Sequence, residues 1–226
     1  MHRYLLYLLL LFPVLPGGCR SDEQKAGRSG NTARGAASDA LEAVQEEPVR
    51  QAGRSDTTDF PAAFAQFFAA LQAEDTAALG RYIDPQKGIW LIEQPGAVPA
   101  YTHFQTIRAV QRHYQHKPFT SLKEQLQACE LEERQEFPRF DCAWMDKGRS
   151  GYAADGCFYH NTTDFKTSDM WRYASLSPQQ EQEVQQLQQQ VLKTVLHTRS
   201  SYRFYFTYDG TYWRLLFADM RTPCSA

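Results

Sequence analysis

Apolar residues after position 59 recur three or four positions apart, which is the spacing of an α-helix with one buried face. These positions are Phe60, Phe64, Phe67, Phe68 and Leu71. Asp59 stands where an N-cap is expected, and Pro61 falls in the first turn, where proline is tolerated. Asp75 predicts the cap of a second, short helix that ends before Pro85. The folded part is therefore expected to begin with a pair of helices.

A second amphipathic pattern predicts a long helix over residues 178–197. Ser177, Pro178 and Gln180 supply an N-cap, a first-turn proline and the partner residue of a capping box. The apolar face of this helix is formed by Val184, Leu187, Val191 and Val195. The opposite face is mostly glutamine, so we expect it to face water.

Alternating side chains near the C-terminus predict a β-hairpin over residues 201–220, with its turn at Asp209-Gly210. Because side chains of a strand alternate between its two faces, one face carries Tyr202, Phe204, Phe206 and Tyr208. The other face carries Arg203, Tyr205 and Thr207. Both faces contain aromatic rings, so we expect both to be covered by other elements.

The middle of the chain has weaker patterns. Residues 88–96 predict a strand that is closed by a Pro-Gly turn. Helical spacing of apolar residues predicts a third helix over 101–116, whereas short apolar runs predict strands over 126–131 and 139–144. The glycine-rich stretch 145–156 predicts a loop.

Residues 1–18 have the pattern of a cleaved signal peptide, with a basic start and a short apolar run over 4–15. The run is too short for a membrane-spanning helix, which needs about 20 apolar residues. Gly17, Gly18 and Cys19 follow it, and this break resembles the lipobox of bacterial lipoproteins. The resemblance implies that the signal is cut before Cys19 and that the cysteine sulfur receives a diacylglycerol. The alternative is an ordinary secreted protein that is cleaved nearby.

Arg20 follows the cysteine, and within the lipoprotein resemblance this residue implies the outer membrane of the cell envelope. Residues 19–58 contain no aromatic side chain and mix small, acidic and basic residues. Such a composition buries too little apolar surface to offset the entropy of ordering, so it predicts a disordered, lipid-anchored tether. The membrane is thus the first expected partner, through the lipid anchor.

Composition indicates one domain beyond the tether. The chain has 226 residues, of which 42% are hydrophobic, and these values fit a single globular domain over 59–226. Its formal net charge is -2, with acidic and basic residues mixed along the sequence. Such a chain offers no concentrated positive surface, so we expect no nucleic-acid partner.

The chain contains four cysteines besides Cys19, an even number that predicts two disulfides in an exported protein. Three pairings are possible. We favour Cys142 with Cys224, because this bridge pins the short tail after the last strand, and it leaves Cys129 with Cys157. There is no Cys-x-x-Cys spacing, so we expect no redox site, no metal site and no cofactor.

Histidines are the remaining candidates for chemistry. His103, His113 and His116 are close in sequence but lack acidic or cysteine ligands at zinc-site spacing. His160 and Asp164 are near enough in sequence for an acid/base pair. The chain has no nucleophile elbow, phosphate-binding glycine loop or dinucleotide fingerprint. We therefore expect no catalytic and no metal-ligating residues.

The opening "FFAALQAEDTAAL" and the closing hairpin resemble the NTF2-like, or cystatin-like, α+β fold. This resemblance implies N-terminal helices packed on a curved antiparallel sheet that ends in a hairpin. We expect a non-enzymatic envelope lipoprotein that binds an envelope protein or a small ligand. One alternative is an NTF2-like hydrolase or isomerase that uses His103, His113 or His160 with an acidic neighbour. Another is a structural subunit of a surface assembly.

Overall fold

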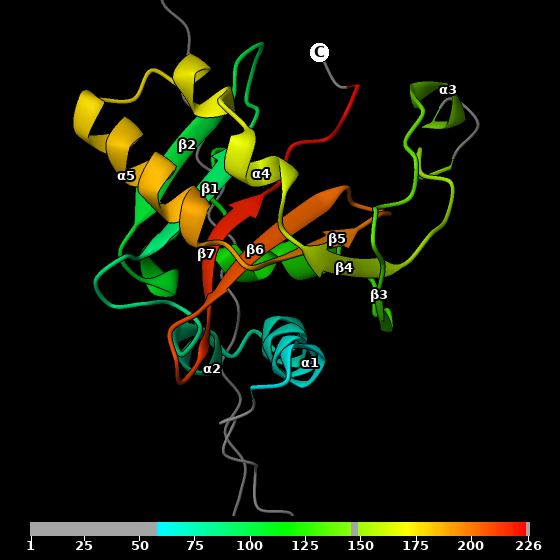
Figure 1. Ribbon diagram of the computed structural model, residues 1–226, viewed down its shortest axis with the longest axis horizontal. Coiled ribbons are helices and arrows are strands. Elements are labelled where there is room, and N and C mark those ends of the chain that lie inside the picture. Colours follow the sequence, from blue (N-terminus) through cyan, green and yellow to red (C-terminus); the bar gives the residue numbers. More distant parts are fainter. Residues whose placement is uncertain (1–57, 146–148, 225–226) are drawn as a thin grey trace, which may run out of the picture. The chain divides into compact units, whose positions relative to one another are not determined.

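A mixed sheet of seven strands forms the centre of the α+β domain in the computed structural model, which describes residues 58–145 and 149–224 (Figure 1). The strands are β1 (Ile89–Glu93), β2 (Ala100–Phe104), β3 (Leu131–Glu133), β4 (Cys157–Asn161), β5 (Lys193–His197), β6 (Tyr202–Tyr208) and β7 (Trp213–Asp219). Their spatial order is β2-β1-β7-β6-β5-β4-β3. The β1/β7 and β3/β4 pairs are parallel and the others antiparallel. The expected antiparallel sheet is therefore wrong at these two pairs, because the chain returns to the same end of the sheet between the two strands of each pair.

Helices lie on both sides of this sheet (Figure 1). The helical elements are α1 (Phe60–Gln72), α2 (Thr76–Gly80), η1 (Ile107–Ala109), η2 (Phe119–Glu124), α3 (Cys142–Met145), α4 (Asp164–Thr167), η3 (Met170–Tyr173) and α5 (Pro178–Gln190). Helices α1 and α2 lie on one side, and α4 and α5 lie on the other. Both faces of the central hairpin are thus covered, as its two-sided aromatic pattern predicts.

Aromatic rings fill the space between α1 and the sheet. The Asp59 side chain caps α1 by accepting a hydrogen bond from the Ala62 backbone N–H at 3.2 Å, as predicted. Phe67 is fully buried, with ring centroids 5.7 Å from Phe204 and 5.4 Å from Phe206. These edge-to-face contacts add to the burial energy of each ring, about 1.5–3 kcal/mol. The space between α1 and this face of the hairpin is therefore filled with side chains.

Helix α5 covers part of the opposite face. Its N-terminus has the predicted capping box, with reciprocal hydrogen bonds between Ser177 and Gln180. Val184 and Leu187 belong to the same buried cluster as Trp90 of β1. The helix ends at Gln190 rather than at residue 197, because the β-branched stretch that follows pairs with β4 and β6 as strand β5.

Three predictions for the middle of the chain are wrong. Residues 101–116 form β2 and the short η1 rather than a helix, because pairing with β1 satisfies the backbone there. The stretch 126–131 reaches a strand only at its last residue, where β3 begins. Residues 139–144 contain one isolated bridge, between Phe140 and Tyr152, and then enter α3. The signal peptide, Cys19 and the tether lie outside the described residues.

The structure contains two disulfides, as the even cysteine count predicts. One joins Cys129, just before β3, to Cys157 at the start of β4. The other joins Cys142 of α3 to Cys224 in the segment after β7. Disulfides persist in oxidising compartments, so they indicate an extracytoplasmic location. Within the described residues, no helix has the length and apolar character needed to cross a membrane.

The α1 packing generates a test of the core. Replacing Phe67 with Ala is expected to lower the free energy of unfolding by about 3–5 kcal/mol, because the cavity is closed in by rings and cannot collapse. The neighbouring Gln66→Ala, on the exposed side of the same helix, is the matched control and is expected to change it by less than about 0.5 kcal/mol. Urea unfolding measures the free energy of unfolding of both variants. Equal losses of stability in the two variants would contradict the packing of Phe67 against the sheet.

Candidate functional site

A polar cavity is lined by residues of α4 and of strands β4 to β7, on the face of the sheet opposite the one that packs on α1. Its volume is about 290 Å³. The lining residues that carry charge or titrate are His160, Asp164, Arg203, Tyr205, Asp219 and Arg221. They come from three strands, one helix and the segment after β7, so the fold assembles them from distant parts of the sequence.

Strand register places the floor of this cavity on one face of the sheet. Arg203 of β6 lies directly opposite Asp219 of β7. Two residues further along β6, Tyr205 lies opposite Thr194 of β5, and Thr194 lies opposite His160 of β4. Residues directly opposite each other in a ladder point to the same side. The floor is therefore fixed by backbone hydrogen bonds rather than by a flexible loop.

Asp219 and Arg221 form a two-pronged ion pair at one end of the floor. The Arg221 Nη2 and Nε atoms donate to the two Asp219 carboxylate oxygens at 2.7 and 2.9 Å. The Asp219 side chain is only 2% exposed. Burial disfavours the charge on Arg221, but the hydrogen bonds and charge of Asp219 outweigh it and raise the Arg221 pKa. The two charges therefore largely neutralise each other.

Arg203 brings a positive charge to the floor that has no carboxylate partner. Its Nη2 atom donates a hydrogen bond to the Tyr152 hydroxyl at 3.2 Å. Across 58–145 and 149–224, Arg203 forms no ion pair. Asp164 also lines the cavity, but its residue is exposed, and water screens its charge. Arg203 is therefore the cation of the floor that is available to pair with an anionic ligand.

Phe165 of α4 forms a wall beside these charges, and its ring lies against Tyr205 of the floor. The rings of Phe165 and Tyr205 stack with centroids 3.7 Å apart. Burial, with a smaller contribution from the charge of Asp219, raises the pKa of the Tyr205 phenol. Tyr205 therefore keeps its proton at neutral pH. The cavity thus combines the Arg203 guanidinium of its floor with an apolar wall.

The histidines singled out by sequence lie in different places. His160 and Asp164 both line the cavity, but no hydrogen bond joins them, and His160 Nδ1 bonds the Asn161 carbonyl. The His103 ring packs against Trp90 in a tilted arrangement, with ring centroids 5.0 Å apart.

The other two histidine candidates follow β2 in the sequence. His113 Nε2 lies 3.3 Å from Thr102 Oγ1, and His116 is exposed. Among the described residues, His103, His113 and His116 do not form a group of potential metal ligands.

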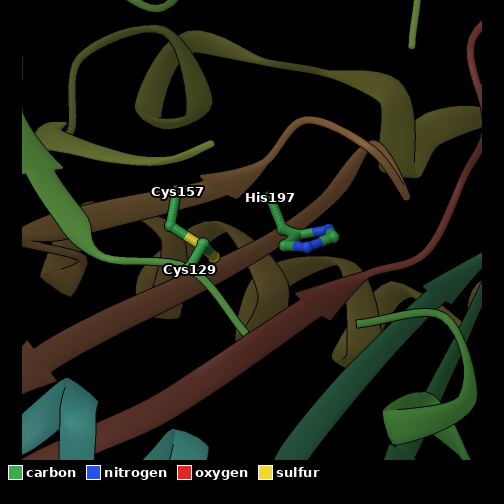
Figure 2. A group of neighbouring side chains, drawn as sticks. All are labelled: Cys129, Cys157 and His197. Carbon is green, nitrogen blue, oxygen red and sulfur yellow. A yellow bond between two sulfur atoms is a disulfide. The ribbon is translucent and has the colours of Figure 1, made fainter. Parts of the chain in front are cut away.

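A group that the sequence did not indicate surrounds one disulfide. Figure 2 shows Cys129, Cys157 and His197 side by side, with the two sulfurs bonded. One potential ligand atom from each residue lies within 4.8 Å of the other two. Cys157 of β4 is directly opposite His197 of β5 in the ladder, so tertiary pairing rather than sequence spacing brings them together. His197 and Cys157 are buried.

Three comparisons with known proteins give no relative from which to transfer a function. No protein-family model, no curated protein and no solved structure matches this chain. The cavity and the cysteine-histidine group therefore carry the functional argument by themselves.

Removing one partner of the buried ion pair tests the electrostatics of the cavity. Arg221→Met is expected to cost about 3 kcal/mol of stability at pH 7, because Asp219 keeps a buried charge without its partner. Urea unfolding at pH 7 measures this loss relative to the native chain.

The double variant Asp219→Asn/Arg221→Met separates charge from packing in this test. It removes both charges and keeps an acceptor for the backbone N–H of residue 221, which bonds Asp219 at 3.1 Å. We expect it to recover most of the lost stability in urea unfolding at pH 7. If the double variant is as unstable as Arg221→Met, the unpaired charge of Asp219 is not the cause of the lost stability.

Proposed function

We propose that this chain is a non-enzymatic cell-envelope lipoprotein whose domain binds a small carboxylate-bearing molecule in the cavity between the sheet and α4. The observation that carries the proposal is the position of Arg203, a guanidinium on a rigid floor with no carboxylate partner in the described part of the chain. A guanidinium binds a carboxylate through two parallel, charge-assisted hydrogen bonds.

The size and wall of the cavity restrict the rest of the ligand. A volume of about 290 Å³ lies near the lower limit for small-molecule pockets, so it favours a compact ligand. The stacked Phe165 and Tyr205 rings offer an apolar surface beside the cation. A carboxylate attached to a flat, apolar body satisfies both the charge and the wall.

The envelope location is supported by two independent features. The lipobox-like break at Gly17, Gly18 and Cys19 supports lipid attachment, and Arg20 supports the outer membrane. The two disulfides fit an oxidising compartment. The stretch between Cys19 and residue 58 then serves as a tether that separates the domain from the lipid headgroups.

Within this proposal the domain is NTF2-like. The support is the opening helix α1 packed across one face of the sheet and the closing β6/β7 hairpin at its centre. Aromatic rings fill the space under α1, which favours a binding role for the other face over an enzyme site beneath the helix.

An alternative proposal keeps the cavity but gives it acid/base chemistry. His160 and Asp164 both line it, and this position supports the alternative of a hydrolase or isomerase. The carboxylate-binding proposal is better supported, because the Nδ1 atom of His160 already bonds a backbone carbonyl and no hydrogen bond between the two side chains is present in the described part.

Benzoate and its neutral isostere benzamide test the carboxylate preference. Isothermal titration calorimetry is expected to show benzoate binding to the native chain at least about tenfold more tightly than benzamide, since a charge-assisted hydrogen bond contributes about 1.5–3 kcal/mol. Arg203→Met should remove this preference. Arg108→Met is the matched control, because Arg108 is exposed and lies outside this cavity.

Thermal unfolding of both variants ensures that a lost signal reflects binding rather than folding. Equal affinity for the two probes, or equal losses in the Arg203 and Arg108 variants, would overturn the proposed role of Arg203.

Lipid attachment has its own test. Cys19→Ala is expected to move the protein from the membrane fraction to the soluble fraction, because the diacylglycerol-bearing sulfur is lost. Ser21→Ala, two residues away, is the control and should remain with the membrane. Immunoblots of fractionated cells measure this distribution, and unchanged membrane association of the Cys19 variant would exclude the lipid anchor.

A further inference from the structure

The cysteine-histidine group has the donor set of a metal site, although its sulfurs are bonded to each other. Two thiolates and one imidazole suit zinc, and three protein ligands leave a fourth position for water or another ligand. The three residues come from separate segments, just before β3 and at one end each of β4 and β5. From the geometry of this group we infer that reduction of the Cys129–Cys157 disulfide creates a zinc site with His197 as its third ligand.

The ladder holds two of these ligands in place whether or not the disulfide is formed. Cys157 and His197 are directly opposite each other in the antiparallel β4/β5 pair, which continues into β6. His197 is 3% exposed and Cys157 is 1% exposed, so little water competes for them. Sites on strands are positioned more accurately than sites on loops.

Cys129 is the ligand with freedom to adjust. It lies two residues before β3 and is only partly buried. A reductant therefore approaches the disulfide from the Cys129 side. After the sulfurs separate, a small movement of this segment makes room for an ion between the two thiolates.

A second residue orients the imidazole. The Ser200 backbone N–H donates to His197 Nδ1 at 3.2 Å, and the Ser200 hydroxyl lies 2.7 Å from the same atom. Because Nδ1 accepts the Ser200 N–H, the proton of the neutral ring lies on Nε2. Metal binding through Nε2 requires this proton to move to Nδ1, where the Ser200 hydroxyl oxygen accepts its hydrogen bond and holds the ring in place. The exposed Cys142–Cys224 disulfide differs, since it belongs to no such group among the described residues.

The proposed step balances as follows. A dithiol transfers two electrons and two protons to the Cys129–Cys157 disulfide, which becomes two thiols while the dithiol becomes a disulfide. Zn²⁺ then displaces the two thiol protons and binds the thiolates. Neutral His197 shifts its proton from Nε2 to Nδ1 and donates the Nε2 lone pair, so the ring loses no proton overall. In the reverse direction a second disulfide accepts two electrons and two protons and becomes a dithiol, while the Cys129–Cys157 bond re-forms and Zn²⁺ is released.

Two single-disulfide proteins provide the test, both in the full chain with Cys19→Ala. Cys142→Ser/Cys224→Ser keeps the pair beside the histidine, and Cys129→Ser/Cys157→Ser keeps the other pair. Each is reduced with a phosphine, whose oxide takes its oxygen from water, and is titrated with Co²⁺ and then Zn²⁺. Only the first is expected to develop sulfur-to-cobalt charge-transfer absorption at one ion per chain, and Zn²⁺ should displace it.

Adding His197→Asn to the first protein is expected to weaken Zn²⁺ binding at least about tenfold. Equal binding by the two single-disulfide proteins, no stoichiometric binding by the first, or no effect of His197→Asn would each overturn the inference. Far-UV circular dichroism follows the fold throughout. If reduction alone unfolds the first protein, Zn²⁺ must restore the native spectrum, and failure to do so also overturns the inference.

Discussion

The antiparallel register of β4, β5, β6 and β7 is the constraint on which the candidate sites depend. It places Arg203 beside Asp219 on one face of the sheet and Cys157 beside His197 on the other. A slip of one residue would move every side chain of a strand to the opposite face. The rings under α1 prevent such a slip, because Phe204 and other large apolar side chains of β6 would then leave the core.

The two faces of the sheet have different capacities for function because they are covered differently. Helix α1 and the rings beneath it fill one face. On the other face, α5 packs over Trp90, and the area near β4 and β5 is bordered by the short α4 instead. The charged groups of the cavity lie in the area of this face that α5 does not cover. A buried pair, Asp219 with Arg221, forms one end of the floor, and Arg203 remains without a carboxylate partner within the described residues.

Sequence patterns predicted the parts of the fold that are set by local chemistry. The capped helices at Asp59 and Ser177, and the alternation of the last hairpin, need only neighbouring residues. That alternation also put Arg203 and Tyr205 on one face. The helix expected over 101–116 was wrong, because pairing with β1 outweighed the helical spacing of the apolar residues.

Other features depend on contacts between distant strands, which no local pattern contains. The parallel β1/β7 pair and the approach of His197 to Cys157 are of this kind. The central claim is that Arg203 binds a carboxylate there. A crystal structure of the protein with benzoate tests it most directly. The account predicts the carboxylate within about 3 Å of the Arg203 guanidinium, with the ring against Phe165 and Tyr205. Benzoate bound elsewhere, or a cavity that holds only water at saturating benzoate, would contradict it.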